Sequence, residues 1–394
     1  MTDSKRTILL LAVAQALYSC CIITVFATAG LVGLNIAPSP AWATLPVTTF
    51  VIGAMFTTVP ASLLMQRLGR KPVFLFGAGV SILGAALAVW SIITANFAAF
   101  CFATAMQGVF QATAGFYRFA AAEAADEGNK SIAISWVLTG GVVAAIAGTL
   151  ISNYTSELIP SHSFAGSYAA AIILALLNMA VVSRLAIPKP SAEVTAGPKR
   201  SWPELLRQPK LIVAMACAMV AYSMMNLMMT ATPNAMIFCG FNKSDASFVI
   251  QWHVLAMYVP SFFAGQVIKR YGAEKITALG MVLLMIAAGA GLAGITFGHF
   301  AVALIILGLG WNFGFIGATT MLTDCYRPAE RGKVQAANDL GISMLMVIAS
   351  LSSGFILSGL GWHAVPMAVF PPAALALAMV GWLWLQPKTR NDAA

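Results

Sequence analysis

The sequence predicts an all-α membrane protein with twelve transmembrane helices in two six-helix lobes. Of its 394 residues, 60% are hydrophobic and only 9% are charged, and the mean hydropathy is +0.85. Apolar runs of about 20 residues, the length that crosses a bilayer, follow one another along the whole chain. The basic residues fall on one side of the topology that these runs imply. These observations together exclude a soluble domain.

Apolar runs separated by Pro, Gly and charged residues define the predicted helices. The spans are residues 7–33, 45–66, 72–93, 96–120, 131–152, 166–187, 211–238, 246–268, 274–296, 299–322, 335–359 and 365–386. The first run is longer than the core of a signal peptide and has no clear small-residue cleavage site. We therefore expect it to be retained in the protein.

The net charge of +9 is explained by membrane topology rather than by nucleic-acid binding. With the N-terminus inside, all but Lys243 of the 22 Lys and Arg residues lie at cytoplasmic helix ends or loops. This distribution follows the positive-inside rule, and it supports the count of twelve because a missed helix would exchange the two sides. We expect both termini to be cytoplasmic and no nucleic-acid partner.

Six cysteines are spread along the chain without a close CxxC pair. This spacing supports neither a disulfide framework nor a zinc site. Cys20, Cys21, Cys101 and Cys217 lie within predicted helices, where buried thiols usually serve as packing residues. Cys239 differs because it lies at the outer end of the span 211–238.

The chain divides into two similar halves. Residues 1–187 and 211–394 each contain six spans, and residues 188–210, rich in Pro, Ser, Lys and Arg, form a basic cytoplasmic linker. Arg67–Lys71 and Lys269–Lys275 follow the second helix of each half. Such a repeat, with a site near the midplane between the halves, is typical of secondary transporters.

Two motifs resemble those of the major facilitator superfamily. Leu64–Lys71 is similar to the superfamily signature between the second and third helices, and Gln107-Gly108 is similar to its fourth-helix motif. Gln66 replaces the usual Asp of the signature, and Thr104 replaces the Arg expected in the fourth helix. The resemblance implies the major facilitator fold, but these departures argue against a proton-coupled drug exporter. The acidic residues also lie in loops or near helix ends, which leaves proton antiport without an obvious carrier.

Arg118 and Asp339 have two possible roles. Arg118 lies at the cytoplasmic end of the fourth span and Asp339 at the start of the eleventh. Arg118 can extend to the cytoplasmic surface, or it can pair with Asp339 as an inner gate. The sequence leaves both alternatives open.

A set of methionines and one histidine lies in the seventh and eighth spans. Met225 and Met229 are one helical turn apart, as are His253 and Met257. A short loop joins the two antiparallel spans, so Met229 is level with His253, and Met225 with Met257. Three thioethers and an imidazole suit cuprous copper. Packing methionines and a hydrogen-bonded packing histidine are the alternative.

The paired Met-x-x-x-Met and His-x-x-x-Met patterns resemble those of CcoA-like copper importers, a branch of the superfamily. The resemblance implies copper import across the bacterial inner membrane by alternating access, to supply assembly of cbb3-type cytochrome oxidase. Copper would then be the transported substrate, with no prosthetic group and no enzymatic activity. The same resemblance also implies a thiol redox or copper-relay role for Cys239. We expect a monomer in the lipid bilayer, with copper chaperones as candidate partners.

The competing hypothesis is an organic cargo such as riboflavin or an amphipathic drug. Trp252, Tyr258, Trp311 and Asn312 would then line the pathway, and His253 would form a hydrogen bond with the cargo.

Overall fold

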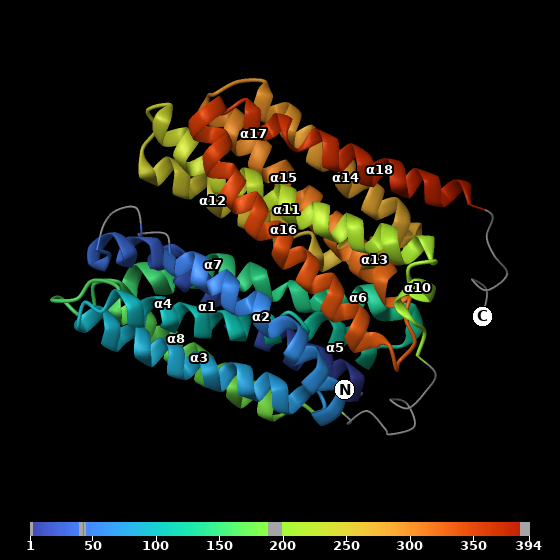
Figure 1. Cartoon of the computed structure of the whole chain (residues 1–394), viewed down its shortest axis with the longest axis horizontal. Coiled ribbons are helices and arrows are strands. Elements are labelled where there is room, and N and C mark those ends of the chain that lie inside the picture. Colours follow the sequence, from blue (N-terminus) through green and yellow to red (C-terminus); the bar gives the residue numbers. More distant parts are fainter. Residues whose placement is uncertain (1–2, 39–41, 43–44, 188–198, 387–394) are drawn as a thin grey trace. The chain divides into compact units, whose positions relative to one another are not determined.

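The computed structural model describes residues 3–38, 42, 45–187 and 199–386, and the regular elements among these residues are all helices (Figure 1). The α-helices are α1 (Asp3–Ile36), α2 (Leu45–Leu68), α3 (Arg70–Ile93), α4 (Phe97–Ala114), α5 (Tyr117–Ala124), α6 (Lys130–Leu138), α7 (Gly140–Thr155), α8 (Ala165–Ser183), α10 (Trp202–Leu205), α11 (Pro209–Phe238), α12 (Lys243–Tyr258), α13 (Ser261–Tyr271), α14 (Ala273–Leu292), α15 (Phe297–Thr323), α16 (Arg331–Leu360), α17 (Ala364–Met367) and α18 (Phe370–Leu385). One short 3-10 helix, η2, covers Glu127–Asn129.

The predicted all-helical membrane fold is confirmed. Among the described residues, eleven helices are long and apolar enough to cross a membrane, and a bent pair, Phe248–Tyr258 with Ser261–Tyr271, makes up to twelve. The eighth span was predicted as one helix over 246–268. It is instead bent by 40° at Pro260, because proline has no N–H to continue the backbone ladder.

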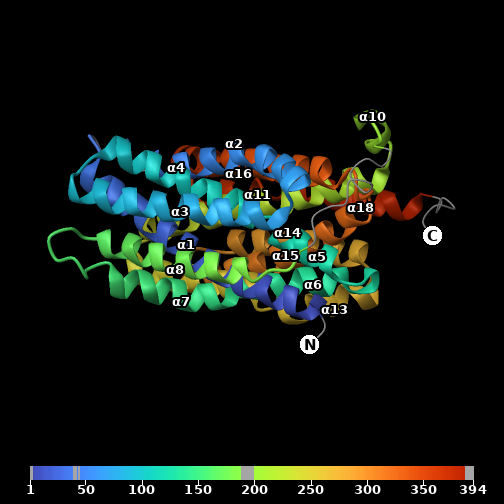
Figure 2. The same ribbon diagram turned by 90° about the horizontal axis from the view of Figure 1, so that it is seen from below.

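The chain forms two compact units. The first contains Met1–Pro198 and Pro328–Val347, and the second contains Lys199–Arg327 and Ile348–Ala394. The long helices run side by side within each unit (Figure 2). The start of α16 joins the first unit in this division, and the predicted halves, 1–187 and 211–394 with a linker at 188–210, stay a prediction. The linker residues 188–198 lie outside the described residues.

Both units contain a glycine turn where the sequence repeat was predicted. Gly69 separates α2 from α3 with φ of 90°, and Gly272 separates α13 from α14 with φ of 93°. Only glycine adopts such angles without steric cost. The correspondence between Arg67–Lys71 and Lys269–Lys275 therefore extends to the backbone conformation.

A glycine brings two helices of the first unit into close contact. A Cβ atom added to Gly108 of α4 would lie 2.1 Å from the Phe50 carbonyl oxygen and 2.6 Å from the Ala54 amide nitrogen of α2. Small residues allow such approach in membranes, where van der Waals packing replaces the hydrophobic effect between helices.

The second unit repeats this contact with different side chains. A Cβ atom added to Gly308 of α15 would lie 2.7 Å from the His253 carbonyl oxygen and 2.9 Å from the Met257 amide nitrogen of α12. In both units the glycine contacts the backbone carbonyl of one residue and the backbone amide of the residue four positions later in the facing helix. His253 thus occupies the place in the second unit that Phe50 occupies in the first.

We expect Gly108→Ala to destabilise the protein, because the new methyl group must push α4 away from the α2 backbone. Overpacking of this kind costs about 1–3 kcal/mol. Thermal unfolding of the detergent-purified protein measures the change. Gly289→Ala in α14 is the matched control, since no neighbour lies within 4 Å of the added atom. Equal unfolding temperatures for the two variants would contradict the close contact.

Candidate functional site

His253 holds a defined tautomer in the core of the second unit. Its side chain is fully buried, and Nδ1 lies 2.7 Å from the carbonyl oxygen of Leu304 in α15. A carbonyl only accepts, so Nδ1 carries the hydrogen and Nε2 carries the lone pair. No described residue provides a hydrogen-bond partner for Nε2. The ring therefore presents an unused acceptor inside the unit.

The predicted methionine set lies in the same unit. Met225 and Met257 are buried, and Met229 is half-buried. The His253 ring, however, forms its hydrogen bond with α15 and not with α11. This hydrogen bond fixes the Nδ1 edge of the ring against α15, and Nε2 is the nitrogen left to act as a ligand. The role of these four residues as metal ligands stays a prediction.

Asn312 connects α15 to the bend between α12 and α13. Its Nδ2 donates to the Met257 carbonyl at 2.6 Å and to the Ser261 hydroxyl at 2.7 Å. Its Oδ1 is buried, and no described residue donates to it. Asn312 thus stabilises the bend and leaves its Oδ1 as a second buried acceptor of the second unit.

An aromatic cluster surrounds Trp311. Tyr222 of α11 and Tyr258 of α12 meet its ring edge-on, with centroid distances of 5.4 and 5.6 Å. Phe315 stacks on it at 5.1 Å. Trp311 and Phe315 are buried, whereas the two tyrosines are half-buried. Tyr258 and Trp311, which were both predicted to line the pathway of an organic cargo, are therefore in contact.

Trp252 and Cys239 lie at exposed positions. Trp252 is 47% exposed and pairs with Phe248, at a centroid distance of 6.0 Å. Cys239 caps the C-terminus of α11 and is the exposed member of the six cysteines, all of which are free thiols. Among the described residues, no group of three or more His, Cys, Asp and Glu side chains is placed to hold a metal. The relay role of Cys239 stays a prediction.

In the first unit, Arg118 and Asp339 form an ion pair. Arg118 Nη2 of α5 lies 2.5 Å from Asp339 Oδ1 of α16, and the side chains are only 11% and 13% exposed. Asn338 Nδ2 donates to the same carboxylate oxygen at 2.9 Å. The Arg118 guanidinium also lies over the Phe119 ring, 4.5 Å from its centroid. The ion pair with Asp339 favours the pairing alternative over extension of Arg118 to the surface.

A second charged network of the first unit was not predicted. Glu123 of α5 accepts hydrogen bonds from Arg70 of α3 and from Arg331 at the start of α16. Arg70 also donates to Gln335 at 3.1 Å. The sequence contained one signal for this network. Glu123 follows the fourth span and lies on the same side of the predicted topology as the signature motif.

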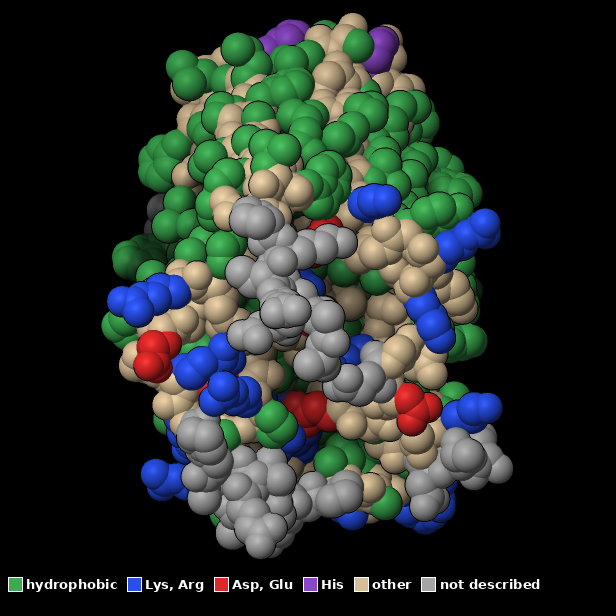
Figure 3. All heavy atoms as spheres, turned by 90° about the vertical axis from the view of Figure 1, so that its right-hand side faces the viewer, with side chains coloured by type: hydrophobic (Ala, Val, Ile, Leu, Met, Phe, Trp, Pro, Cys, Tyr) green, Lys and Arg blue, Asp and Glu red, His purple; other side chains and the backbone are tan. Residues whose placement is uncertain are grey.

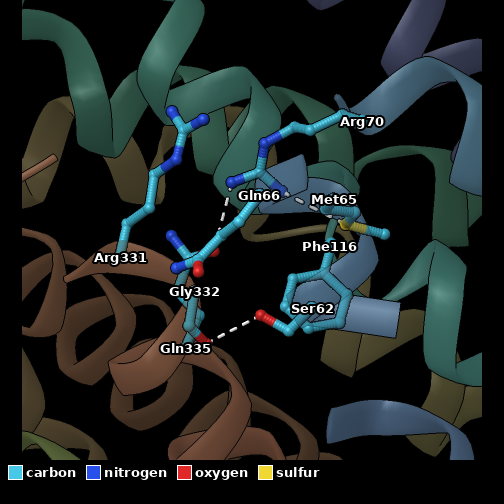
Figure 4. Close-up of a pocket in the computed structure, with 8 residues that line it drawn as sticks. All are labelled: Ser62, Met65, Gln66, Arg70, Phe116, Arg331, Gly332 and Gln335. Atoms are coloured by element: carbon cyan, nitrogen blue, oxygen red, sulfur yellow. Dashed lines mark hydrogen bonds between the residues drawn. The ribbon is translucent and has the colours of Figure 1, made fainter. Parts of the chain in front are cut away.

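A small pocket adjoins this network. Figure 4 shows its lining residues, which come from α2, α3, α16 and the turn before α5: Ser62, Met65, Gln66, Arg70, Phe116, Arg331, Gly332 and Gln335. Ser62 donates to the Gly332 carbonyl at 2.7 Å. A Cβ atom at Gly332 would lie 2.2 Å from Gln66 Nε2, so the amide that replaces the usual acid packs directly on the first turn of α16.

Comparisons with known proteins identify the family. The model of the Major Facilitator Superfamily matches residues 9–238 and 215–394. The chain is 43% identical over 391 residues to the riboflavin transporter RfnT of Brucella anthropi, covering 98% of each protein. It is 26% identical to the uncharacterized transporter YdeG of Bacillus subtilis, covering 96% of this chain and 92% of the relative.

Solved structures agree in fold. The fucose:proton symporter FucP of E. coli gives a TM-score of 0.76 at 14% identity, with 97% of this chain and 98% of that chain covered. The proton:xylose symporter XylE gives 0.77 at 13% identity, with 98% and 96% covered. Family model, relatives and fold span nearly the whole chain. The chain therefore belongs to the Major Facilitator Superfamily and is a membrane transporter, not an enzyme.

Proposed function

We propose that the protein transports riboflavin or a closely related flavin across the bacterial inner membrane by alternating access. The observation that carries this proposal is the 43% identity to the riboflavin transporter RfnT over 98% of both chains. This relationship supports the organic-solute alternative and not the resemblance to CcoA-like copper importers. Copper as cargo, and a supply of copper to cbb3-type oxidase, have no support from the comparisons.

The chemistry of the second unit is compatible with a flavin. The isoalloxazine ring is a planar aromatic system, and the half-buried Tyr222 and Tyr258, held in place by the buried Trp311, provide aromatic surface for contact with it. Flavin imide and ribityl groups donate hydrogen bonds, and His253 Nε2 and Asn312 Oδ1 are acceptors without a described donor. Riboflavin is neutral, so its transport needs no charged partner within the membrane.

The Arg118–Asp339 pair fits the role of an inner gate in this transport cycle. It connects α5 to α16 through buried charges, and separating such charges is costly unless each finds a new partner. The basic residues support an orientation with cytoplasmic termini, which places this pair toward the cytoplasm.

The cargo is tested by uptake into proteoliposomes that contain the purified protein. We expect saturable uptake of labelled riboflavin and no protein-dependent uptake of cuprous ion. Met225→Leu with Met229→Leu conserves volume, typically at a cost under about 1.5 kcal/mol, and should leave flavin uptake near normal because a flavin needs no thioether ligand. Copper uptake that depends on these two sulfurs, without flavin uptake, would reinstate the copper hypothesis.

A substitution at His253 tests recognition by the second unit. His253→Phe introduces the residue found at the matching contact of the first unit, so a planar ring remains between the helices, while the Nε2 acceptor and the Nδ1 hydrogen bond to Leu304 are both lost. A neutral hydrogen bond contributes ~1 kcal/mol, which corresponds to about a fivefold higher KM for riboflavin. Met257→Leu, one turn away, is the control and should leave KM unchanged. An unchanged KM in His253→Phe would show that His253 serves in helix packing and not in cargo recognition.

Loss of the ion pair should open the inner end of the transporter. Arg118→Gln leaves Asp339 buried without its cation, and breaking a buried pair costs about 3–5 kcal/mol. Ser62→Cys in a background without native cysteines reports the opening, since Ser62 is only 1% exposed. We expect faster labelling by an impermeant maleimide from the cytoplasmic side.

Two variants control this experiment. Lys210→Gln removes the cation of an exposed pair with Asp324 in the second unit and should not change labelling. Exchange of the gate charges, Arg118→Asp with Asp339→Arg, should restore slow labelling. Slow labelling in Arg118→Gln would argue against the gate.

A further inference from the structure

The short helix α10 stands directly before the membrane span Pro209–Phe238. It therefore lies where the chain passes from water into lipid. The segment 199–210 contains four basic residues, Lys199, Arg200, Arg207 and Lys210, and one acidic residue, Glu204. Figure 3 looks onto this end of the molecule, where many Lys and Arg side chains are displayed.

Several contacts hold this segment against the second unit. Ser201 and Glu204 form a capping box, in which the Ser201 amide donates to Glu204 Oε2 at 2.6 Å. This backbone bond lowers the pKa of Glu204, because it stabilises the ionised carboxylate. Leu205 is fully buried, and Arg200 Nη2 donates to the Cys325 carbonyl at 3.0 Å. These contacts fix the orientation of α10, so the side opposite Leu205 faces outward.

The exposed side combines apolar and basic residues. Trp202 and Leu206 are 37% and 48% exposed and lie four positions apart, on one side of the helical turn. Arg207, the next residue in the sequence after Leu206, is also exposed. Tryptophan occupies the headgroup level of bilayers, and basic residues near the surface attract anionic lipids.

We propose that α10 and Arg207 form a binding site for an anionic phospholipid headgroup. Trp202 and Leu206 contact the lipid at the level of the glycerol and first acyl carbons, while the Arg207 guanidinium pairs with the phosphate. The excess of basic over acidic residues in 199–210 provides the charge complementarity. This proposal does not depend on the identity of the cargo.

Lipid titration of the full-length protein in detergent tests the site. Bound phosphatidylglycerol or phosphatidylcholine is counted by native mass spectrometry. A basic residue near the surface contributes ~1 kcal/mol, so Arg207→Gln should lower phosphatidylglycerol affinity about fivefold and leave phosphatidylcholine binding unchanged. Trp202→Ala should weaken both lipids, because the aromatic contact does not depend on headgroup charge.

Arg184→Gln is the matched control, since Arg184 is an exposed basic residue at the end of α8 in the first unit. It should not change phosphatidylglycerol binding. Equal losses in Arg184→Gln and Arg207→Gln, or no loss in Trp202→Ala, would overturn the site. Displacement of the lipid by inorganic phosphate, but not by chloride at equal ionic strength, would show a site for free phosphate and also overturn it.

Discussion

The structure depends on one constraint, which is that the bilayer core offers no water to polar groups. Each helix must satisfy its own backbone, and each polar side chain within a span needs a partner in the protein. Where Pro260 interrupts the eighth span, the Asn312 amide donates to the Met257 carbonyl and the Ser261 hydroxyl. The same constraint explains why Arg118 and Asp339 meet although 221 positions separate them.

Hydropathy and charge distribution were sufficient to predict the fold because lipid imposes both on the sequence. The bend at Pro260 was missed because hydropathy defined the run 246–268, and hydropathy does not report helix direction. Arg118 and Asp339 were recognised as unusual, but their pairing requires tertiary structure. Glu123 was overlooked because a carboxylate at a helix end looks like an ordinary surface residue until Arg70 and Arg331 are placed beside it.

The cargo could not be derived from the spacing of Met and His residues. A four-residue interval places side chains on one helix face, but it does not say which neighbour that face contacts. For His253 the neighbour is α15, where the contact with Gly308 sets the distance between helices. The thioethers and imidazole suggested a soft metal, whereas the same unit also contains hydrogen-bond acceptors and aromatic rings. The relationship to a riboflavin transporter favours the second set of features.

The matching contacts at Gly108 and Gly308 have an evolutionary consequence. Each depends on backbone atoms and a missing Cβ, so the side chain at the contacting position can vary without a change in helix spacing. One half has Phe50 at this position and the other has His253. A single substitution at this position can thus change the polarity of one half while the distance between its helices is kept.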